Sequence, residues 1–158
     1  MDNIEIERKF LVKKLPDNLE SYPKKEILQG YLNTSPAIRV RSENEEYFLT
    51  YKGSGFIKHS EYNLPLDRES FNHLINKCDN LIIRKTRYII PLQGCPDLKA
   101  ELDIFKAELK GLIIVEVEFK DEKEANSFIA PDWFGRDVSL DKSYHNSNLS
   151  RNKKLPLS

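Results

Sequence analysis

Charged and apolar residues alternate along much of the chain, and this period of two predicts β-strands. The first such stretch covers residues 4–12. Glu5, Glu7 and Lys9 share one face of this strand, and apolar side chains lie on the other. The same pattern predicts seven further strands, over residues 27–32, 37–41, 46–52, 59–66, 81–92, 99–105 and 112–119.

Three helices are expected, each preceded by an aspartate. Aspartate is a favoured N-cap residue because its carboxylate accepts hydrogen bonds from the free N–H groups of the first turn. The helices are expected over residues 68–77, 122–128 and 142–150, behind Asp67, Asp121 and Asp141. Residues 131–135, which include Trp133 and Phe134, are expected to form a loop with aromatic anchors.

The spacing of the strands indicates how they are arranged. Short turns separate most of them, which makes successive strands antiparallel neighbours. Eight such strands with a few modest helices predict an α+β fold, an eight-stranded antiparallel β-barrel with flanking helices and a C-terminal helix. The length of 158 residues fits one domain, expected over residues 1–150, with a C-terminal tail at 151–158.

The composition argues against several classes of protein. Lys+Arg and Asp+Glu number 25 each, so no net charge points to nucleic acid or to a membrane surface. No apolar run has the length of a signal peptide or a transmembrane helix. Cys78 and Cys95 match no metal or disulfide spacing, and reduced thiols are typical of the cytoplasm. We therefore expect a cytoplasmic monomer or homodimer that binds neither nucleic acid nor membrane.

The charged positions are sorted by sign from strand to strand. The acidic pairs are Glu5/Glu7, Glu101/Asp103 and Glu116/Glu118, and the basic residues are Arg39, Arg41, Lys52, Lys85 and Arg87. A strand that faces water usually mixes both signs. Like charges two residues apart repel one another, and an opposite charge nearby relieves that repulsion.

Two arrangements of the sheet account for these charges. In a simple sandwich, the charged faces point outward into water. In a barrel, the charged faces line an interior lumen, and the apolar faces are covered by helices outside. The sorting by sign and the apolar faces of the predicted helices favour the barrel. A lumen with one acidic and one basic wall suits a divalent cation beside a small polyanion such as a chain of phosphates.

The chain resembles the CYTH superfamily, the triphosphate tunnel metalloenzymes, in five stretches: residues 4–10, Arg39-x-Arg41, Lys85-x-Arg87, Glu101-x-Asp103 and Glu116-x-Glu118. The resemblance covers nearly the whole chain, and it is strongest to the short bacterial members. It implies an eight-stranded tunnel in which Lys and Arg bind triphosphate and glutamates hold Mg²⁺ or Mn²⁺. Activities in the superfamily include inorganic tripolyphosphatase, thiamine triphosphatase, RNA triphosphatase and class IV adenylyl cyclase.

The resemblance also implies roles for individual residues. The expected metal ligands are Glu5, Glu7, Glu116 and Glu118, with Glu61, Glu101 and Asp103 as a second set of candidates. The expected triphosphate-binding residues are Lys9, Arg39, Arg41, Lys52, Lys85, Arg87 and Lys142. Two alternatives stay open, namely that the glutamates form internal salt bridges and that Glu101 and Asp103 orient basic residues.

Tyr31 and Lys9 stand where a catalytic pair is proposed for the short bacterial members. A tyrosine with its ordinary pKa of about 10 is a poor base at neutral pH, but a nearby lysine and a cation lower that pKa. The alternative is that Tyr31 only positions a water molecule or a phosphate. The chain departs from the usual pattern at His59 and Asn63, where relatives often have R-x-E-x-E, and at Ser143, where they often carry a base.

The function expected from the sequence is metal-dependent hydrolysis of inorganic tripolyphosphate, with Mg²⁺ or Mn²⁺ as cofactor. The alternatives are a class IV adenylyl cyclase-like enzyme, a thiamine or nucleoside triphosphatase, and a module that binds polyphosphate or nucleotide without turnover. The sequence contains no clear purine site, which disfavours the cyclase.

Overall fold

The computed structural model describes residues 4–151, which form nine strands and six short helices. The strands are β1 (Ile4–Val12), β2 (Lys24–Thr34), β3 (Ala37–Glu43), β4 (Glu46–Lys52), β5 (Lys58–Leu66), β6 (Asp79–Leu92), β7 (Cys95–Phe105), β8 (Ile113–Glu118) and β9 (Phe134–Asp137). The α-helices are α1 (Arg68–Ile75), α2 (Glu122–Ser127) and α3 (Asn146–Arg151), and the 3₁₀ helices are η1 (Leu19–Ser21), η2 (Ala107–Leu109) and η3 (Lys142–Tyr144).

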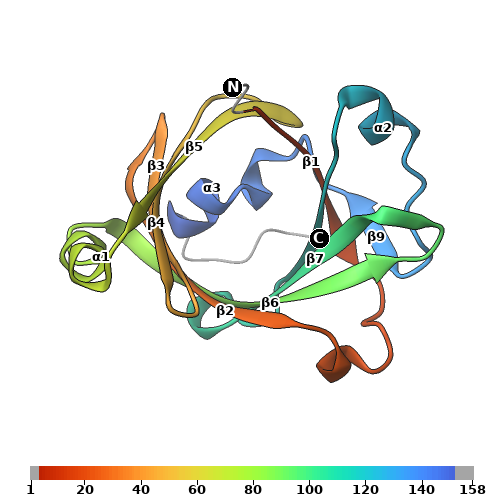
Figure 1. Ribbon diagram of the computed structural model, residues 1–158, viewed down its shortest axis with the longest axis horizontal. Coiled ribbons are helices and arrows are strands. Elements are labelled where there is room, and N and C mark those ends of the chain that lie inside the picture. Colours follow the sequence, from red (N-terminus) through yellow and green to blue (C-terminus); the bar gives the residue numbers. More distant parts are fainter. Residues whose placement is uncertain (1–3, 152–158) are drawn as a thin grey trace.

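Eight of the strands form a closed antiparallel barrel (Figure 1). Around the ring the order is β5-β4-β3-β2-β6-β7-β8-β1, and a pairing between β1 and β5 completes it. One edge of β1 pairs with β8, while its other edge pairs first with β5 and then, nearer Val12, with β9. The predicted eight-stranded barrel is therefore confirmed, and β9 is an additional short strand beside it.

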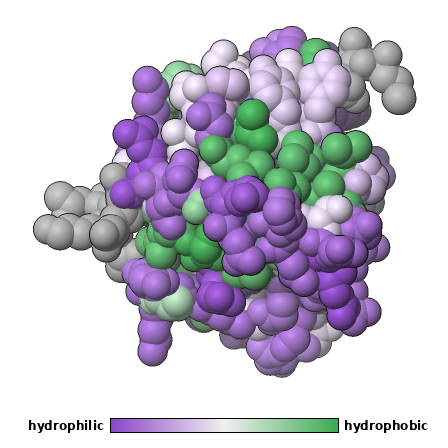
Figure 2. All heavy atoms as spheres, turned by 90° about the vertical axis from the view of Figure 1, so that its left-hand side faces the viewer, coloured by the Kyte–Doolittle hydropathy of each residue, from purple (hydrophilic) through white to green (hydrophobic). Residues whose placement is uncertain are grey.

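The barrel keeps charged residues inside and leaves apolar surface outside. Lys85 and Asp103 are 1% and 0% exposed, whereas Tyr62 and Leu64 on β5 are 55% and 58% exposed. Figure 2 shows the side of the molecule that carries α1 and β3–β5, where apolar side chains form an exposed patch among hydrophilic ones. The alternative of a sandwich with its charged faces turned outward is thus wrong.

One hydrophobic core covers the outside of the barrel wall. It joins Phe10 of β1 to Ala125 of α2 and Phe134 of β9, all of them buried. The Phe10 and Phe134 rings lie 5.0 Å apart between their centroids. α2 and β9 therefore cover the apolar face of the strand that carries the Glu5–Lys9 segment, and they help to fix that strand in place.

A second core fills part of the inside of the barrel at one end. Ile83, Phe105 and Ile114 lie on the same strand faces as the inward charged residues, and they belong to one buried cluster with Tyr144 and Leu149. Figure 1 shows α3, which carries Leu149, lying within the ring of strands. The lumen is therefore partly closed at this end by the C-terminal segment.

The predicted helix starts are confirmed, but the last helix is interrupted. The Asp67, Asp121 and Asp141 carboxylates accept hydrogen bonds from the backbone N–H of Ser70, Glu124 and Ser143 at 2.7, 2.7 and 3.1 Å. The predicted helix over 142–150 is divided at His145, whose ψ of 136° is extended and separates η3 from α3. Arg151 still belongs to α3, and the rest of the predicted tail, residues 152–158, lies outside the described residues.

Other boundaries also differ from the prediction. Residues 131–135 are not all loop, because Phe134 begins β9 and pairs with Val12. β2, β6 and β7 begin earlier than predicted, at Lys24, Asp79 and Cys95. Within residues 4–151 there is no helix whose length and apolar character would let it cross a lipid bilayer.

Candidate active site

The lumen holds charged side chains that are almost fully withdrawn from water. Each of the following is 8% exposed or less: Lys9, Arg39, Arg41, Lys85, Arg87, Asp103 and Glu116. They reach the interior because they alternate with outward-facing residues along their strands. Charged groups at this depth need an opposite charge, from the protein or from a ligand.

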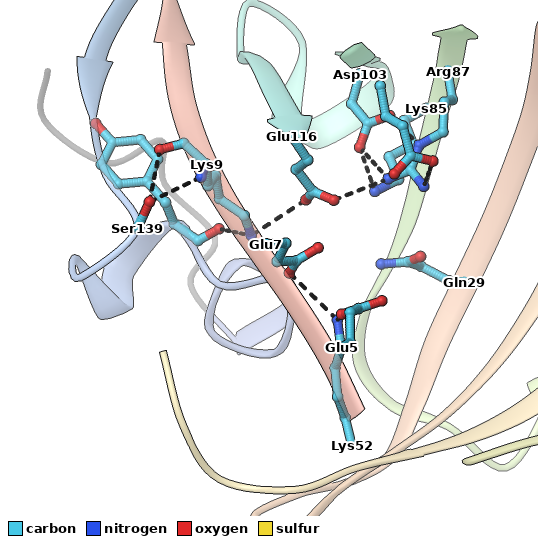
Figure 3. Close-up of polar contacts among 12 residues, drawn as sticks. Glu5, Glu7, Lys9, Gln29, Lys52, Lys85, Arg87, Asp103, Glu116 and Ser139 are labelled. Carbon is cyan, nitrogen blue, oxygen red and sulfur yellow. Dashed lines mark hydrogen bonds and ion pairs between the residues drawn. The ribbon is translucent and has the colours of Figure 1, made fainter. Parts of the chain in front are cut away.

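Asp103 on β7 holds two bases of β6 together (Figure 3). Lys85 Nζ lies 2.7 Å from Asp103 Oδ2, and Arg87 donates to both carboxylate oxygens, from Nε at 2.7 Å and from Nη2 at 2.8 Å. Burial raises the pKa of Asp103, but Arg87 and Lys85 outweigh it and lower that pKa. Burial also lowers the pKa of Lys85 to about 7, against the effect of Asp103. This geometry favours an orienting role for Asp103 over metal ligation.

Glu116 on β8 links this cluster to β1. Its Oε1 lies 3.4 Å from Lys9 Nζ, and its Oε2 lies 3.4 Å from Arg87 Nη2. Burial raises the pKa of Glu116, yet Lys9 and Arg87 hold it well below its usual range. Lys9 is fixed further, because its Nζ donates to the Tyr144 carbonyl at 3.2 Å and its backbone N–H donates to Ser139 Oγ at 2.9 Å.

β2 and β3 present donors that lack acceptors. Arg41 donates from Nε to Gln29 Oε1 at 2.8 Å and from Nη1 to Glu43 Oε1 at 3.2 Å. Gln29 Nε2 and Arg39 Nε are buried and have no hydrogen-bond partner among the residues that the structure describes. Burial, together with Arg39 and Arg87, lowers the pKa of Arg41 to about 10. We call Gln29, Arg39 and Arg41 the donor wall, which an anion can satisfy.

Gln29 is a candidate that the sequence analysis did not single out. It is 0% exposed and lies opposite Arg41 in the register of β2 and β3. The available signal was its position two residues before Tyr31, on the same strand face. The amide of Gln29 carries no charge, so the pattern of acidic and basic pairs could not identify it.

Across the lumen, Glu5 and Glu7 of β1 meet His59 of β5. Two carboxylate oxygens and one imidazole nitrogen lie within 4.8 Å of one another, and His59 Nε2 is 2.6 Å from Glu5 Oε1. Lys52 of β4 reaches the same place, with its Nζ 2.9, 3.6 and 3.7 Å from carboxylate oxygens of Glu5, Glu7 and Glu61. Burial lowers the pKa of Lys52, but Glu7 and Glu5 raise it above its ordinary value. We call Glu5, Glu7 and His59 the acidic cluster.

Two adjoining cavities connect the donor wall with the acidic cluster. The first, of about 190 Å³, is lined by residues that include Lys9, Tyr31 and His59. The second, of about 250 Å³, is lined by residues that include Arg41 and Arg87. Both cavities share Glu7, Arg39, Lys52 and Asn146. Acids, bases and the tyrosine therefore line two adjoining polar cavities.

Tyr31 and Lys9 face the first cavity from strands that are not neighbours. β2 pairs with β3 and β6, whereas β1 pairs with β5, β8 and β9. The two side chains therefore approach the cavity from separate parts of the ring. Tyr31 is only 4% exposed and packs in the inner core with Tyr144. Its ring position is set by packing, which leaves the phenol at the wall of the cavity.

Glu118 and Lys142 lie apart from the buried charges. The Glu118 side chain is exposed overall and lies opposite Glu7 in the register of β8 and β1. Its carboxyl group is nevertheless partly desolvated, and this desolvation, together with Glu5 and other acids, raises its pKa to about 7. Lys142 in η3 is exposed and places its Nζ 5.7 Å from the centroid of the Phe56 ring. It lines a separate surface hollow with Arg136 and not either cavity.

The remaining residues that depart from the usual pattern make local contacts. Asn63 donates to Glu61 at 2.9 Å and accepts from Thr50 at 2.6 Å, so it holds one acid at the edge of the second cavity. Ser143 donates its hydroxyl to Asp141 at 2.6 Å as part of the η3 cap. The structure therefore gives Ser143 a local structural contact, and Lys142 next to it is exposed and lines neither cavity.

The closed barrel with buried charges of both signs along its lumen defines the class of protein. The chain belongs to the CYTH domain family, whose model matches residues 3–154. It is 42% identical over 151 residues to an inorganic triphosphatase of Nitrosomonas europaea, an alignment that covers 92% of this chain and 96% of that protein.

Further comparisons agree on the fold and the family. The chain is 36% identical over 153 residues to an inorganic triphosphatase of Acetivibrio thermocellus, with 94% of each protein covered. A crystal structure of an inorganic triphosphatase superposes with a TM-score of 0.71 at 38% identity, covering 94% of this chain and 95% of that one. The resemblance found in the sequence is thus confirmed.

Proposed function

We propose that this protein is an inorganic triphosphatase that hydrolyses tripolyphosphate with the help of a divalent cation. The observation that carries the proposal is the donor wall, in which Arg39 and Arg41 line the same polar cavity as Glu5 and Glu7, and in which buried N–H groups of Gln29 and Arg39 have no partner within residues 4–151. A chain of phosphates supplies the missing acceptors, and a cation balances its charge against the acids. The two relatives named inorganic triphosphatases support the same substrate.

The arginines that line the second cavity would bind the phosphates. Arg39 and Arg41 face the cavity directly and can make bidentate contacts to phosphate oxygens. Lys85 pairs with Asp103 and lines neither cavity, whereas Arg87 lines the second cavity while Asp103 holds it in orientation. Hydrogen bonds to charged groups contribute about 1.5–3 kcal/mol each, so contacts from Arg39 and Arg41 would contribute substantially to the affinity.

The donors of the acidic wall fit a divalent cation. Glu5, Glu7 and Glu116 offer carboxylate oxygens, the ligands that Mg²⁺ and Mn²⁺ take in proteins, and these ions keep several waters and substrate oxygens besides. When bound, such a cation supplies positive charge that stabilises the negative charge on the phosphate oxygens during transfer. Glu61 and Glu101 also line the second cavity, and Glu118 lies opposite Glu7 in the register of β1 and β8.

Tyr31 and Lys9 are the residues that we assign to proton transfer. A water molecule that attacks a terminal phosphorus must lose a proton, and the Tyr31 phenol is at the wall of the cavity that also contains the Lys9 ammonium. A side chain that accepts this proton acts as a general base, and Tyr31 and Lys9 both line the cavity where the water would be held. Lys9 is fixed for this role by Glu116 and by the Tyr144 carbonyl.

The proposal is tested by measuring phosphate release from tripolyphosphate, ATP and thiamine triphosphate, each with Mg²⁺, with Mn²⁺ and after chelation. We expect release to be fastest from tripolyphosphate and to stop on chelation. The double variant Arg39→Ala/Arg41→Ala is the matched inactive control. Cyclic AMP formed from ATP would instead show a cyclase, and tight binding of tripolyphosphate without release would show a binding module.

A further inference from the structure

We propose that His59 is a nitrogen ligand of the divalent cation and that it makes the acidic cluster prefer a first-row transition-metal ion over Mg²⁺. The inference rests on the proposed function only in expecting a cation at Glu5 and Glu7. It adds a ligand of a different chemical kind, and with it a preference among metal ions.

The register of the barrel brings the three ligand atoms together. Glu5 lies directly opposite His59 in the antiparallel pairing of β1 and β5, and Glu7 follows on the same face of β1. His59 Nε2 is 2.6 Å from Glu5 Oε1, and all three ligand atoms lie within 4.8 Å of one another. His59 is 7% exposed, so packing confines its ring to this side of the lumen.

Two further observations show that this place accepts a cation and that the lumen accepts an anion beside it. The Lys52 ammonium already lies 2.9 Å from Glu5 and 3.6 Å from Glu7, so positive charge is favoured at the acidic cluster. Arg39, which is 6% exposed and whose Nε has no partner in the part of the chain that the structure describes, lines both cavities together with Glu7. Arg39 therefore lines the space that an anion next to the cation would fill.

The chemistry of the three donors sets the metal preference. A neutral imidazole carries a lone pair on one ring nitrogen and can coordinate a metal, which the ammonium of Lys52 cannot do. Mg²⁺ is bound almost entirely by oxygen, whereas imidazole suits ions such as Fe²⁺, Co²⁺, Ni²⁺ and Zn²⁺. Two carboxylates balance a divalent charge, and His59 adds a ligand without adding charge.

The direct test is pulsed electron paramagnetic resonance of the full chain loaded with Mn²⁺ in the absence of any phosphate. Coordination by His59 predicts echo modulation from a directly bound imidazole ¹⁴N, which changes to the ¹⁵N pattern when the protein is grown with ¹⁵N-labelled histidine. This measurement uses the unaltered protein, so it does not depend on whether a variant folds. Bound Mn²⁺ without nitrogen modulation would overturn the proposal.

Variants assign the nitrogen to one of the three histidines. The modulation should disappear in His59→Gln and persist in His73→Gln, a change on the exposed surface of α1, and in His145→Gln, a change in the first cavity. Far-ultraviolet circular dichroism of each metal-free variant checks that it folds. Modulation that survives in His59→Gln, or that disappears in His145→Gln, would overturn the assignment.

Metal affinities give an independent readout. The Kd for Co²⁺, from calorimetry, should rise at least about tenfold in His59→Gln, since even the loss of a residue that only supports a ligand costs about 10- to 100-fold. The Kd for Mg²⁺ should change much less. Equal changes for the two ions would contradict the proposal. These results are separable from the proposed function, because failure to hydrolyse tripolyphosphate would leave the nitrogen signal and the affinities unaffected.

Discussion

Arg87 donates two parallel hydrogen bonds to Asp103 in the interior of the barrel, from Nε to Oδ1 at 2.7 Å and from Nη2 to Oδ2 at 2.8 Å. Lys85 shares the same carboxylate at 2.7 Å. Arg87 also contacts Glu101 and Glu116, so the two bases have carboxylate partners for both of their charges. A polyanion that binds Arg87 would therefore share it with these carboxylates.

Replacing Asp103 with Asn should destabilise the fold strongly, because it leaves Lys85 and Arg87 buried without their shared counter-charge. Breaking a buried ion pair from one side costs about 3–5 kcal/mol. The measurement is the free energy of unfolding in urea. Glu26→Gln is the matched control, since its pair with Lys106 is more than half exposed and should contribute about 1 kcal/mol or less. Equal losses in the two variants would contradict the buried role of Asp103.

Arg39→Ala should weaken tripolyphosphate binding while leaving the melting temperature almost unchanged. Arg39 Nε has no hydrogen-bond partner within residues 4–151, so the folded protein loses no hydrogen bond from that atom. The loss of one charge-assisted contact of about 1.5–3 kcal/mol corresponds to about 10- to 150-fold in Kd. Calorimetry without added metal measures it, and Arg84→Ala, at an exposed position on β6, should bind as the unaltered protein does. Unchanged binding in Arg39→Ala would show that Arg39 does not contact tripolyphosphate.

Tyr31→Phe should spare binding and slow turnover. The ring stays packed in the inner core, and only the phenol oxygen is removed. Loss of a general base typically costs about 10²–10⁴-fold in rate. The measurement is kcat on tripolyphosphate, with Tyr62→Phe on the outer surface as control. A rate within a few-fold of the unaltered protein would leave Tyr31 as a structural residue that positions a water or a phosphate.

Lys52→Met should change two affinities in opposite directions. The Lys52 ammonium lies among the carboxylates of Glu5, Glu7 and Glu61, where it competes with a cation in the absence of substrate. Its removal should therefore tighten Mn²⁺ binding several-fold and weaken tripolyphosphate binding several-fold. Calorimetry of each ligand alone measures both. Weakening of both ligands would show that Lys52 serves only to hold the acids in place.

The metal-free protein should lose stability between about pH 5 and pH 8 through Glu118. Burial and neighbouring acids raise the folded-state pKa of Glu118 to about 7, above its ordinary value. A raised carboxyl pKa means that the folded state binds the proton more tightly, so this stabilisation is present at low pH and is lost as the pH rises through 7. The glutamine side chain in Glu118→Gln does not titrate, so this variant lacks that pH-dependent loss of stability.

The melting temperature of Glu118→Gln should therefore exceed that of the unaltered protein by a margin that grows from pH 5 to pH 8 in the presence of a chelator. Differential scanning calorimetry at several pH values measures the margin. Glu45→Gln is the control, because Glu45 is exposed at the β3–β4 turn. A margin that does not depend on pH would place Glu118 away from the other acids.

The period-two pattern was sufficient to predict the eight barrel strands and the inward direction of their charges. It reports which residues share a face, and like-signed pairs such as Glu116/Glu118 indicated which face is interior. It does not report which strands are neighbours when a long loop, such as residues 13–23, leaves the connection open. The positions of β1 beside β5 and β8, and of Tyr31 across the lumen from Lys9, therefore required the structure.

The pattern of apolar and polar residues did not predict the short strand β9 or the interruption of the final helix. β9 has four residues, begins with Phe134 soon after Pro131, and contains Gly135, so its local signals are those of a turn. The final helix breaks at His145, where the Asn148 side chain donates to the Lys142 carbonyl at 2.7 Å and closes η3. Lys142 follows the predicted cap, is exposed and lines neither lumen cavity.

The ring of strands is closed by three register pairs between β1 and β5, which involve Ile4–Ile6 on β1. The middle pair is Glu5 with His59, and β9 takes over the same edge of β1 a few residues later. A cation bound to the acidic cluster would thus join the two strands at the seam of the barrel. Loss of the cation would first weaken the pairing of β1 with β5. The metal content would therefore set how readily the amide hydrogens of β5 exchange with solvent.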